Sequence, residues 1–338
     1  MKSFPIRCAI LVTMATFFSL SVPIWAQEKV VKLRYSNFFP PTHPASKLVE
    51  QWINEIDKRT NGHVKITYFP GNTLTPPTQT YDSVMKGIAD IGQSLCSYTP
   101  GRFPLMEVTG LPLGVTSGYQ STKLANELYK KFKPKEFEDT KIMYFHAPPP
   151  GIIHTKKVVG SIDEIKGLRI KTNADVADII SALGGIPVTM PITECYDAIS
   201  KGLLDGAFLP LETMKTFRFA EVLKCTIENY AVSPSSPFFV AMNLDKWNSI
   251  SGEDQQIIEK INGEWIEKHA LLWADVDKDA REFALQKGVK FVRASKNEEM
   301  QTAEKMKPIL AKWASTMKGK IPSEEALKFS QDWLAAHP

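Results

Sequence analysis

The chain has 338 residues, with 41 Lys plus Arg against 37 Asp plus Glu, and 43% of its residues are hydrophobic. This length corresponds to about two domains with a core large enough to fold without disulfides or metals. The 23% charged and 10% aromatic residues exclude a disordered or collagen-like chain. A net charge of +4 without a Lys/Arg tract argues against a nucleic-acid partner.

The N-terminus has the pattern of a secretory signal peptide. Lys2 and Arg7 precede an apolar stretch over 8–20, and the small residue Ala26 precedes the polar Gln27. The apolar stretch is too short for a typical membrane span, although an uncleaved anchor is the alternative. We therefore predict that residues 1–26 are removed and that the exported remainder does not span a membrane.

The cysteines, at positions 8, 96, 195 and 225, form no CxxC motif, which argues against a zinc ribbon or a thioredoxin-type pair. Cleavage would leave three of them, an odd number that argues against a disulfide framework. Cys195 and Cys225 are the one pair that we consider.

Strands and helices alternate along the first two thirds of the chain. Residues 30–35 are rich in β-branched side chains, as expected of a strand, and 45–60 carry apolar residues at helical spacing. Residues 63–69 alternate as a second strand. The same alternation continues to about residue 230. It predicts an α/β protein with mostly parallel sheets.

One ten-residue motif occurs twice. Tyr81–Asp90 and Tyr196–Asp205 share five identical positions, which are Tyr, Asp, Lys, Gly and Asp. In both copies Gly is placed to end a short helix and Asp to introduce a strand, and each copy follows a Leu-Arg pair, at 33–34 and 168–169. The repeat predicts two related lobes. Chance recurrence of a helix-stop signal is the alternative.

The C-terminal third predicts a long helix that starts near Ser251 and ends near Gly288. A single helix of about 35 residues would be about 50 Å long and could brace both lobes. The alternative is two helices broken at Gly263.

We find no motif for catalysis, for a cofactor or for a metal. The sequence lacks GxSxG, GxxxxGK[ST], HExxH and a GxGxxG after a strand, and its six histidines include no i,i+4 pair. A two-lobed exported protein of this kind is expected to bind a small molecule between its lobes. A remote alternative is a periplasmic lyase or hydrolase that uses His146 or His154.

Several segments resemble one family of transport proteins. They are Ser161–Lys171, 33–46, 62–71, Asp90-Ile91-Gly92, Gly110–Leu113, and Asp205-Gly206 followed by Pro210. Together they resemble the solute-binding proteins of tripartite ATP-independent periplasmic (TRAP) transporters, the DctP-like family. The spacing agrees from about Val30 to Val292.

The resemblance implies a periplasmic binding protein with two α/β lobes, crossover hinge strands and a long bracing helix. Lobe I would comprise 27–148 and about 235–274, and lobe II 149–234 and about 275–338. The protein would be a monomer that captures an organic acid and delivers it to the small and large membrane subunits of an ion-driven permease. The alternatives are the receptor of an ATP-driven transporter and the ligand-capture subunit of a sensor.

The resemblance also implies where the ligand carboxylate binds. The family carries an Arg at the end of the Gly167–Lys171 strand, where this sequence has Lys171, with Arg169 two residues earlier. Because strand side chains alternate, both could point into the cleft. We expect Lys171 to hold the carboxylate and Arg169 to be the second candidate. That both are surface charges is the alternative.

The remaining candidate residues are apolar. Relatives often carry polar ligand-binding residues after the Asp-Gly pair, whereas this sequence has Ala207-Phe208-Leu209, and Pro148–Gly151 replaces a segment where some relatives carry a second Arg. These departures predict a carboxylate with an apolar or aromatic body. The residues expected to pack against it are Phe38, Phe39, Tyr98, Phe208 and Leu209.

Overall fold

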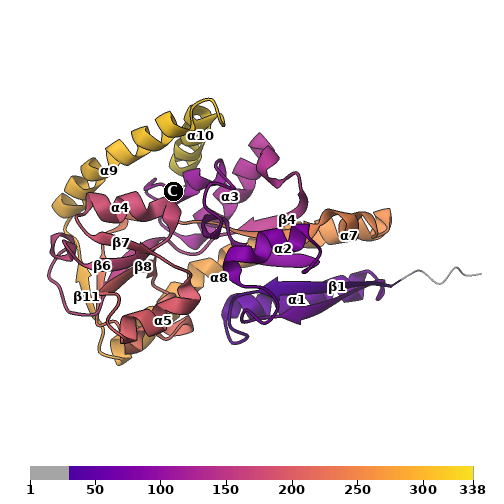
Figure 1. The fold of residues 1–338 in the computed structure, drawn as a ribbon, viewed down its shortest axis with the longest axis horizontal. Coiled ribbons are helices and arrows are strands. Elements are labelled where there is room, and N and C mark those ends of the chain that lie inside the picture. Colours follow the sequence, from indigo (N-terminus) through magenta and orange to yellow (C-terminus); the bar gives the residue numbers. More distant parts are fainter. Residues whose placement is uncertain (1–29, 338) are drawn as a thin grey trace, which may run out of the picture.

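The computed structural model describes residues 30–337, so the predicted signal peptide over 1–26 lies outside the described residues. Two mixed sheets, each with its own helices, form two lobes joined by the long helix α8 (Gly252–Gln286) (Figure 1). No helix within 30–337 is long and apolar enough to cross a membrane.

The sheet of the first lobe has the strand order β2-β1-β3-β10-β4. Its strands are β1 (Val31–Asn37), β2 (Val64–Phe69), β3 (Ile91–Leu95), β4 (Thr140–His146) and β10 (Phe238–Asn243). Strand β10 runs antiparallel to both of its neighbours, while β2, β1 and β3 pair in parallel.

The sheet of the second lobe has the order β11-β9-β5-β8-β6-β7. Its strands are β5 (Gly151–Thr155), β6 (Arg169–Thr172), β7 (Ile186–Thr189), β8 (Gly206–Pro210), β9 (Cys225–Glu228) and β11 (Lys290–Arg293). Here β5 alone runs antiparallel to its neighbours. The α/β fold with mostly parallel sheets is therefore confirmed, with one reversed strand in each sheet.

Both reversed strands follow a crossing between the lobes. The chain leaves β4, crosses at 147–150 and enters the second sheet as β5, and it returns through 233–237 to form β10. The two crossing segments are bonded to each other: Gly151 N donates to Pro234 O at 2.9 Å and Ser235 Oγ donates to Pro148 O at 2.7 Å. These two segments are the crossovers between the lobes that the family resemblance implied, although neither is itself a strand.

Helices pack on each sheet and form separate cores. In the first lobe they are α1 (Pro44–Arg59), α2 (Thr80–Met85), α3 (Gly118–Phe132) and α7 (Leu244–Asn248), and in the second α4 (Ala177–Ala182), α5 (Ile192–Ser200) and α6 (Thr213–Thr216). The apolar stripe of α1, with Val49, Trp52 and Ile56, is buried against β1 and β2. Burial of such a stripe is the main stabilisation of an amphipathic helix.

Helix α8 is one continuous helix. Of the two predicted alternatives, a single bracing helix is therefore correct and a break at Gly263 is wrong. Ser251 caps α8 by accepting a hydrogen bond from Asp254 N, and Gly263 lies inside it. Its first half contacts α1, where Trp52 Nε1 donates to Asn262 Oδ1, and its second half contacts α6, where Lys215 Nζ binds Asp279 Oδ2. Along it, Trp265 is buried in the core of the first lobe, whereas Trp273 belongs to a core that includes residues of both lobes.

Two C-terminal helices follow β11. Helix α9 (Lys296–Met317) packs against α4 of the second lobe, and α10 (Ser323–Ala336) lies against α3 of the first. The predicted bounds of lobe II include both helices. In the structure α9 lies beside a helix of that lobe, whereas α10 lies beside a helix of the other lobe.

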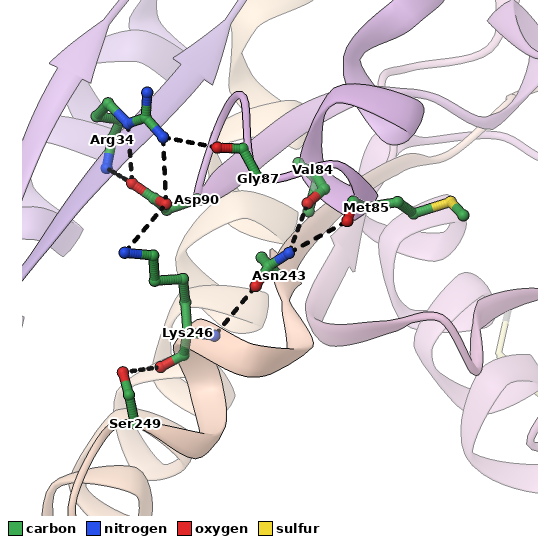
Figure 2. A network of polar contacts seen from close by, with 8 residues as sticks. All are labelled: Arg34, Val84, Met85, Gly87, Asp90, Asn243, Lys246 and Ser249. Atoms are coloured by element: carbon green, nitrogen blue, oxygen red, sulfur yellow. Dashed lines mark hydrogen bonds and ion pairs between the residues drawn. The ribbon is translucent and has the colours of Figure 1, made fainter.

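The repeated motif forms the same structure twice. In the first copy, drawn in Figure 2, Arg34 binds Asp90 through Nε at 3.1 Å and donates to Gly87 O at 2.7 Å. In the second copy, Arg169 binds Asp205 at 2.9 Å and donates to Gly202 O at 2.8 Å. Both glycines have positive φ, +69° and +75°, which glycine adopts without strain. The sequence repeat is thus a structural repeat.

The three cysteines within the described residues, Cys96, Cys195 and Cys225, are buried free thiols. The pair that we considered, Cys195 and Cys225, is not a disulfide in this structure.

Candidate ligand-binding site

A small cavity of about 60 Å³ lies between the two lobes, beside the crossing segments. The first lobe contributes Phe38, Phe39, Leu95, Tyr98 and Phe238, and the crossing segments contribute Pro148, Pro149, Pro234, Ser235 and Ser236. The second lobe contributes Gly151, Lys171, Asn173, Val176, Ile192, Phe208, Leu209, Pro210, Glu212, Thr213 and Phe217. The wall is therefore mainly apolar, with few charged groups.

Lys171 is the cation of this cavity. It lies on β6 and is only 1% exposed, and its Nζ donates to Asn173 Oδ1 at 2.8 Å. Among residues 30–337 no carboxylate lies within ion-pair distance of Nζ, and two of its three N–H donors have no protein acceptor. Burial lowers the pKa of Lys171, and the charges of Cys195 and Asp175 oppose that shift. Such a group favours an incoming anion.

Asp175 is a buried carboxyl near Lys171 that joins the second lobe to a crossing segment. Ser236 Oγ donates to its Oδ2, while its Oδ1 has no hydrogen-bond partner. Burial raises its pKa to about 6, against the opposing effects of the Ser236 hydrogen bond and the Lys171 charge. A carboxyl with this pKa is mostly ionised at neutral pH, so Asp175 is a counter-charge for Lys171, although it lies beyond ion-pair distance of Nζ.

Aromatic rings form the wall contributed by the first lobe. The centroids of Phe38 and Phe39 lie 4.6 Å apart, and Phe238 meets Phe39 edge-on at 5.1 Å. Tyr98 lies beside Phe38 and accepts a hydrogen bond from Ile192 N at 3.0 Å, so that its own hydroxyl proton is free for another acceptor. This wall suits a flat or branched apolar group.

Residues 35–316 match the family model described as bacterial extracellular solute-binding protein, family 7, or DctP. This match covers most of the chain. The chain belongs to this family.

Solved structures agree with this assignment. A TRAP periplasmic solute-binding protein from Desulfovibrio salexigens is 30% identical, with 90% of this chain and 95% of that chain covered and a TM-score of 0.79. A TRAP solute-binding protein from Rhodoferax ferrireducens, in complex with copurified benzoate, is 25% identical over 91% and 98% of the two chains, with a TM-score of 0.86. A third, from Bordetella bronchiseptica with bound (R)- and (S)-mandelate, is 27% identical over 91% and 100%, with a TM-score of 0.84.

The predicted family, fold and function as a TRAP solute-binding protein are confirmed by these matches. Of the receptor classes considered from the sequence, the TRAP receptor is the one that the comparisons support.

Six of the seven predicted site residues of this solute-binding protein line the cavity. They are Lys171, Phe38, Phe39, Tyr98, Phe208 and Leu209. Their roles toward a ligand stay predictions.

Arg169, the seventh, does not line the cavity. Its guanidinium binds Asp205 and Gly202 O, the same contacts that Arg34 makes in the first lobe. Arg169 is the first residue of β6, and Asp205 immediately precedes the neighbouring strand β8. The two side chains therefore lie close enough for the Asp205 carboxylate to bind the guanidinium. The Leu-Arg pair that precedes each copy of the repeated motif was the signal in the sequence that Arg169 has a structural role.

Glu212 is a second charged group in the cavity wall, and sequence reasoning missed it. Its side chain is 4% exposed, its Oε2 accepts from Thr216 Oγ1, and the same oxygen lies 3.5 Å from His43 Nε2. Glu212 stands two residues beyond Pro210, the last residue of the segment 205–210 that resembles the family, so no motif singled it out. Asn173 was missed likewise, although its position two residues after Lys171 on an extended segment places it on the same face.

The histidines of the catalytic alternative are structural in this solute-binding protein. His154 donates through Nε2 to Leu209 O at 3.1 Å, its Nδ1 lies 2.9 Å from Thr226 Oγ1, and burial lowers its pKa to about 4. His146 accepts from Trp273 Nε1 at 3.0 Å and stacks on His269. Neither histidine lines the cavity, so the geometry gives the lyase or hydrolase hypothesis no support.

Proposed function

We propose that this protein is the periplasmic receptor of a TRAP transporter and captures a small organic monocarboxylate with an apolar or aromatic body. The carboxylate binds Lys171, and the apolar body packs against the aromatic wall. The observation that carries this proposal is the burial of Lys171 in the cavity with one neutral partner, Asn173.

A buried ammonium is unfavourable unless an anion or several hydrogen bonds compensate for lost hydration. Asn173 supplies one acceptor, and a ligand carboxylate would supply the charge and further acceptors. Lysine is a point charge without the planar fork of arginine, so Lys171 selects for charge more than for the plane of the carboxylate.

The apolar wall selects the body of the ligand. Phe38, Phe39 and Phe238 present ring faces and edges from one side, and Phe208 and Leu209 lie on the other. The relatives from Rhodoferax ferrireducens and Bordetella bronchiseptica, which contain benzoate and mandelate, support a ligand that combines a carboxylate with a ring.

Residues of both lobes meet around the ligand, so that a bound acid bridges the lobes and favours closure about the two crossing segments. The closed protein, a monomer without catalytic activity of its own, then delivers the acid to the membrane subunits of the permease. Membership of the TRAP family supports this partner.

The test is identification of the natural ligand. Mature protein is purified from its own host without unfolding, then denatured, and the released small molecules are identified by mass spectrometry. We expect a monocarboxylic acid that rebinds in calorimetry with one site per chain. A sugar, a peptide or an inorganic ion as the released ligand would contradict the proposal.

A further inference from the structure

The cavity carries a fixed negative charge as well as a positive one. We infer that Glu212 accepts a hydrogen bond from a hydroxyl group of the ligand, so that the preferred ligand is a hydroxylated acid rather than a simple apolar one. The inference rests on the proposed function, because the carboxylate end of the same ligand occupies Lys171.

Glu212 has unused hydrogen-bonding capacity. Its Oε2 accepts from Thr216 Oγ1 and faces His43, whereas its Oε1 makes no hydrogen bond within the described residues. His43 Nδ1 accepts from Ala45 N at 3.0 Å, so the ring N–H is at Nε2, the atom that faces Glu212. A carboxylate can accept about four hydrogen bonds, so it has room for a ligand donor.

Apolar residues of the cavity wall lie between Lys171 and Glu212, as the register of the sheet shows. Lys171 pairs with Ala207 across the parallel strands β6 and β8. From Ala207 the chain passes the lining residues 208–210 before it reaches Glu212. An acid whose carboxylate is at Lys171 can therefore place its apolar body along β8 and direct a polar substituent toward Glu212.

The surroundings of Glu212 restrict what that substituent can be. Phe39 stacks on His43 at 4.2 Å, and the ring of Phe217 lies 5.9 Å from His43. An apolar substituent there would exclude water and leave Oε1 without a partner, which is costly for a charged acceptor. A second carboxylate would be repelled by Glu212. A hydroxyl donor avoids both penalties.

Calorimetry with matched ligands tests this inference. The probes are benzoate, the three hydroxybenzoates and the corresponding methoxybenzoates, which accept hydrogen bonds but cannot donate them. We expect at least one hydroxybenzoate to bind about tenfold or more tightly than both benzoate and its own methyl ether, as a hydrogen bond to a charged group implies. Equal affinities across the panel would overturn the inference, and this arm needs no variant.

Two variants complete the test. Glu212→Met keeps the length of the side chain without its charge, and we expect it to abolish the preference for the hydroxyl while benzoate binds at least as tightly as in the unaltered protein. Asp279→Asn, which removes an exposed carboxylate in the groove next to Glu212, should leave the preference unchanged. A preference that survives Glu212→Met overturns the inference. Failure of the proposed function would look different, because binding of every probe would then be indifferent to Lys171→Met.

Discussion

Lys171 Nζ donates a hydrogen bond to Asn173 Oδ1 at 2.8 Å, and both residues line the cavity between the lobes. The amide fixes the direction of the ammonium without neutralising it. The cavity therefore holds a positive charge that is oriented and largely unsatisfied, which is the arrangement that a carboxylate ligand completes.

Replacing Lys171 with methionine should weaken binding of the natural acid by about 10- to 150-fold, the range that corresponds to loss of a charge-assisted hydrogen bond. The empty variant should unfold at the same temperature as the unaltered protein or at a higher one, because the burial of a charge is relieved. Calorimetry and thermal unfolding measure the two effects. Lys201→Ala, at an exposed position of the same lobe, is the control, and equal affinity in both variants would refute a role for Lys171.

The two copies of the repeated motif should differ in their contribution to stability. Asp90 also attracts Lys246 (Figure 2). The Asp90 side chain is 2% exposed, whereas that of Asp205 is 34% exposed. We expect Asp90→Ala to lower the free energy of unfolding by about 2–3 kcal/mol, and Asp205→Ala to lower it by less than half of that. Urea unfolding of the ligand-free variants measures both, and a larger loss in Asp205→Ala would contradict the comparison.

Asp277 on α8 should make stability depend on pH. Burial raises its pKa to about 7, and the charge of Glu212 adds to the shift, against the hydrogen bond from Glu212 N and the charge of Arg281. The unfolded carboxyl ionises near 3.8, so between about pH 4 and pH 7 the unfolded state releases a proton that the folded state retains. The folded protein thus loses stability as the pH rises through this window.

Asp277→Asn removes that titration and keeps an acceptor for Glu212 N. Relative to this variant, the unaltered protein should lose about 2–4 kcal/mol of unfolding free energy between pH 4 and pH 7. Urea titrations at several pH values measure the difference. A difference that does not change with pH would show that Asp277 ionises normally.

Two glycines, Gly263 inside α8 and Gly118 in the helix α3 that packs on it, should respond in opposite directions to substitution by alanine. A Cβ at Gly263, inside α8, would meet nothing within 4 Å, so Gly263→Ala should stabilise the protein by about 1 kcal/mol through helix propensity. A Cβ at Gly118, where α3 begins, would overlap the Cβ of Trp273. Gly118→Ala should destabilise the protein by about 1–3 kcal/mol. Urea unfolding of both variants checks the signs, and stabilisation by Gly118→Ala would contradict the close packing of α3 on α8.

Local patterns were sufficient to predict the α/β alternation, the repeated motif and the long helix, whereas the residues of the cavity were predicted from the family resemblance. The apolar spacing after Ser251 predicted α8, and only its continuity through Gly263 needed tertiary packing to decide. The contrast between Lys171 and Arg169 shows where pattern reasoning ended. Alternation put both side chains on one face, but it could not show that Asp205 on the neighbouring strand binds Arg169.

Glu212 illustrates a second limit of the sequence. Its place in the cavity depends on the approach of His43 from the other lobe and on Asp277 from α8, contacts between residues far apart in the chain. A lone glutamate after a strand carries no signal of burial. Glu212, His43 and Asp277 come together only when the two lobes and α8 pack against one another.

We propose that Lys171 binds the carboxylate of the ligand in the cavity between the lobes. The most direct measurement is calorimetric titration of the unaltered protein and of Lys171→Met with the acid that copurifies and with its methyl ester. We expect the unaltered protein to prefer the acid over the ester by about tenfold or more, and Lys171→Met to bind the two alike. An undiminished preference for the acid in Lys171→Met would contradict the claim.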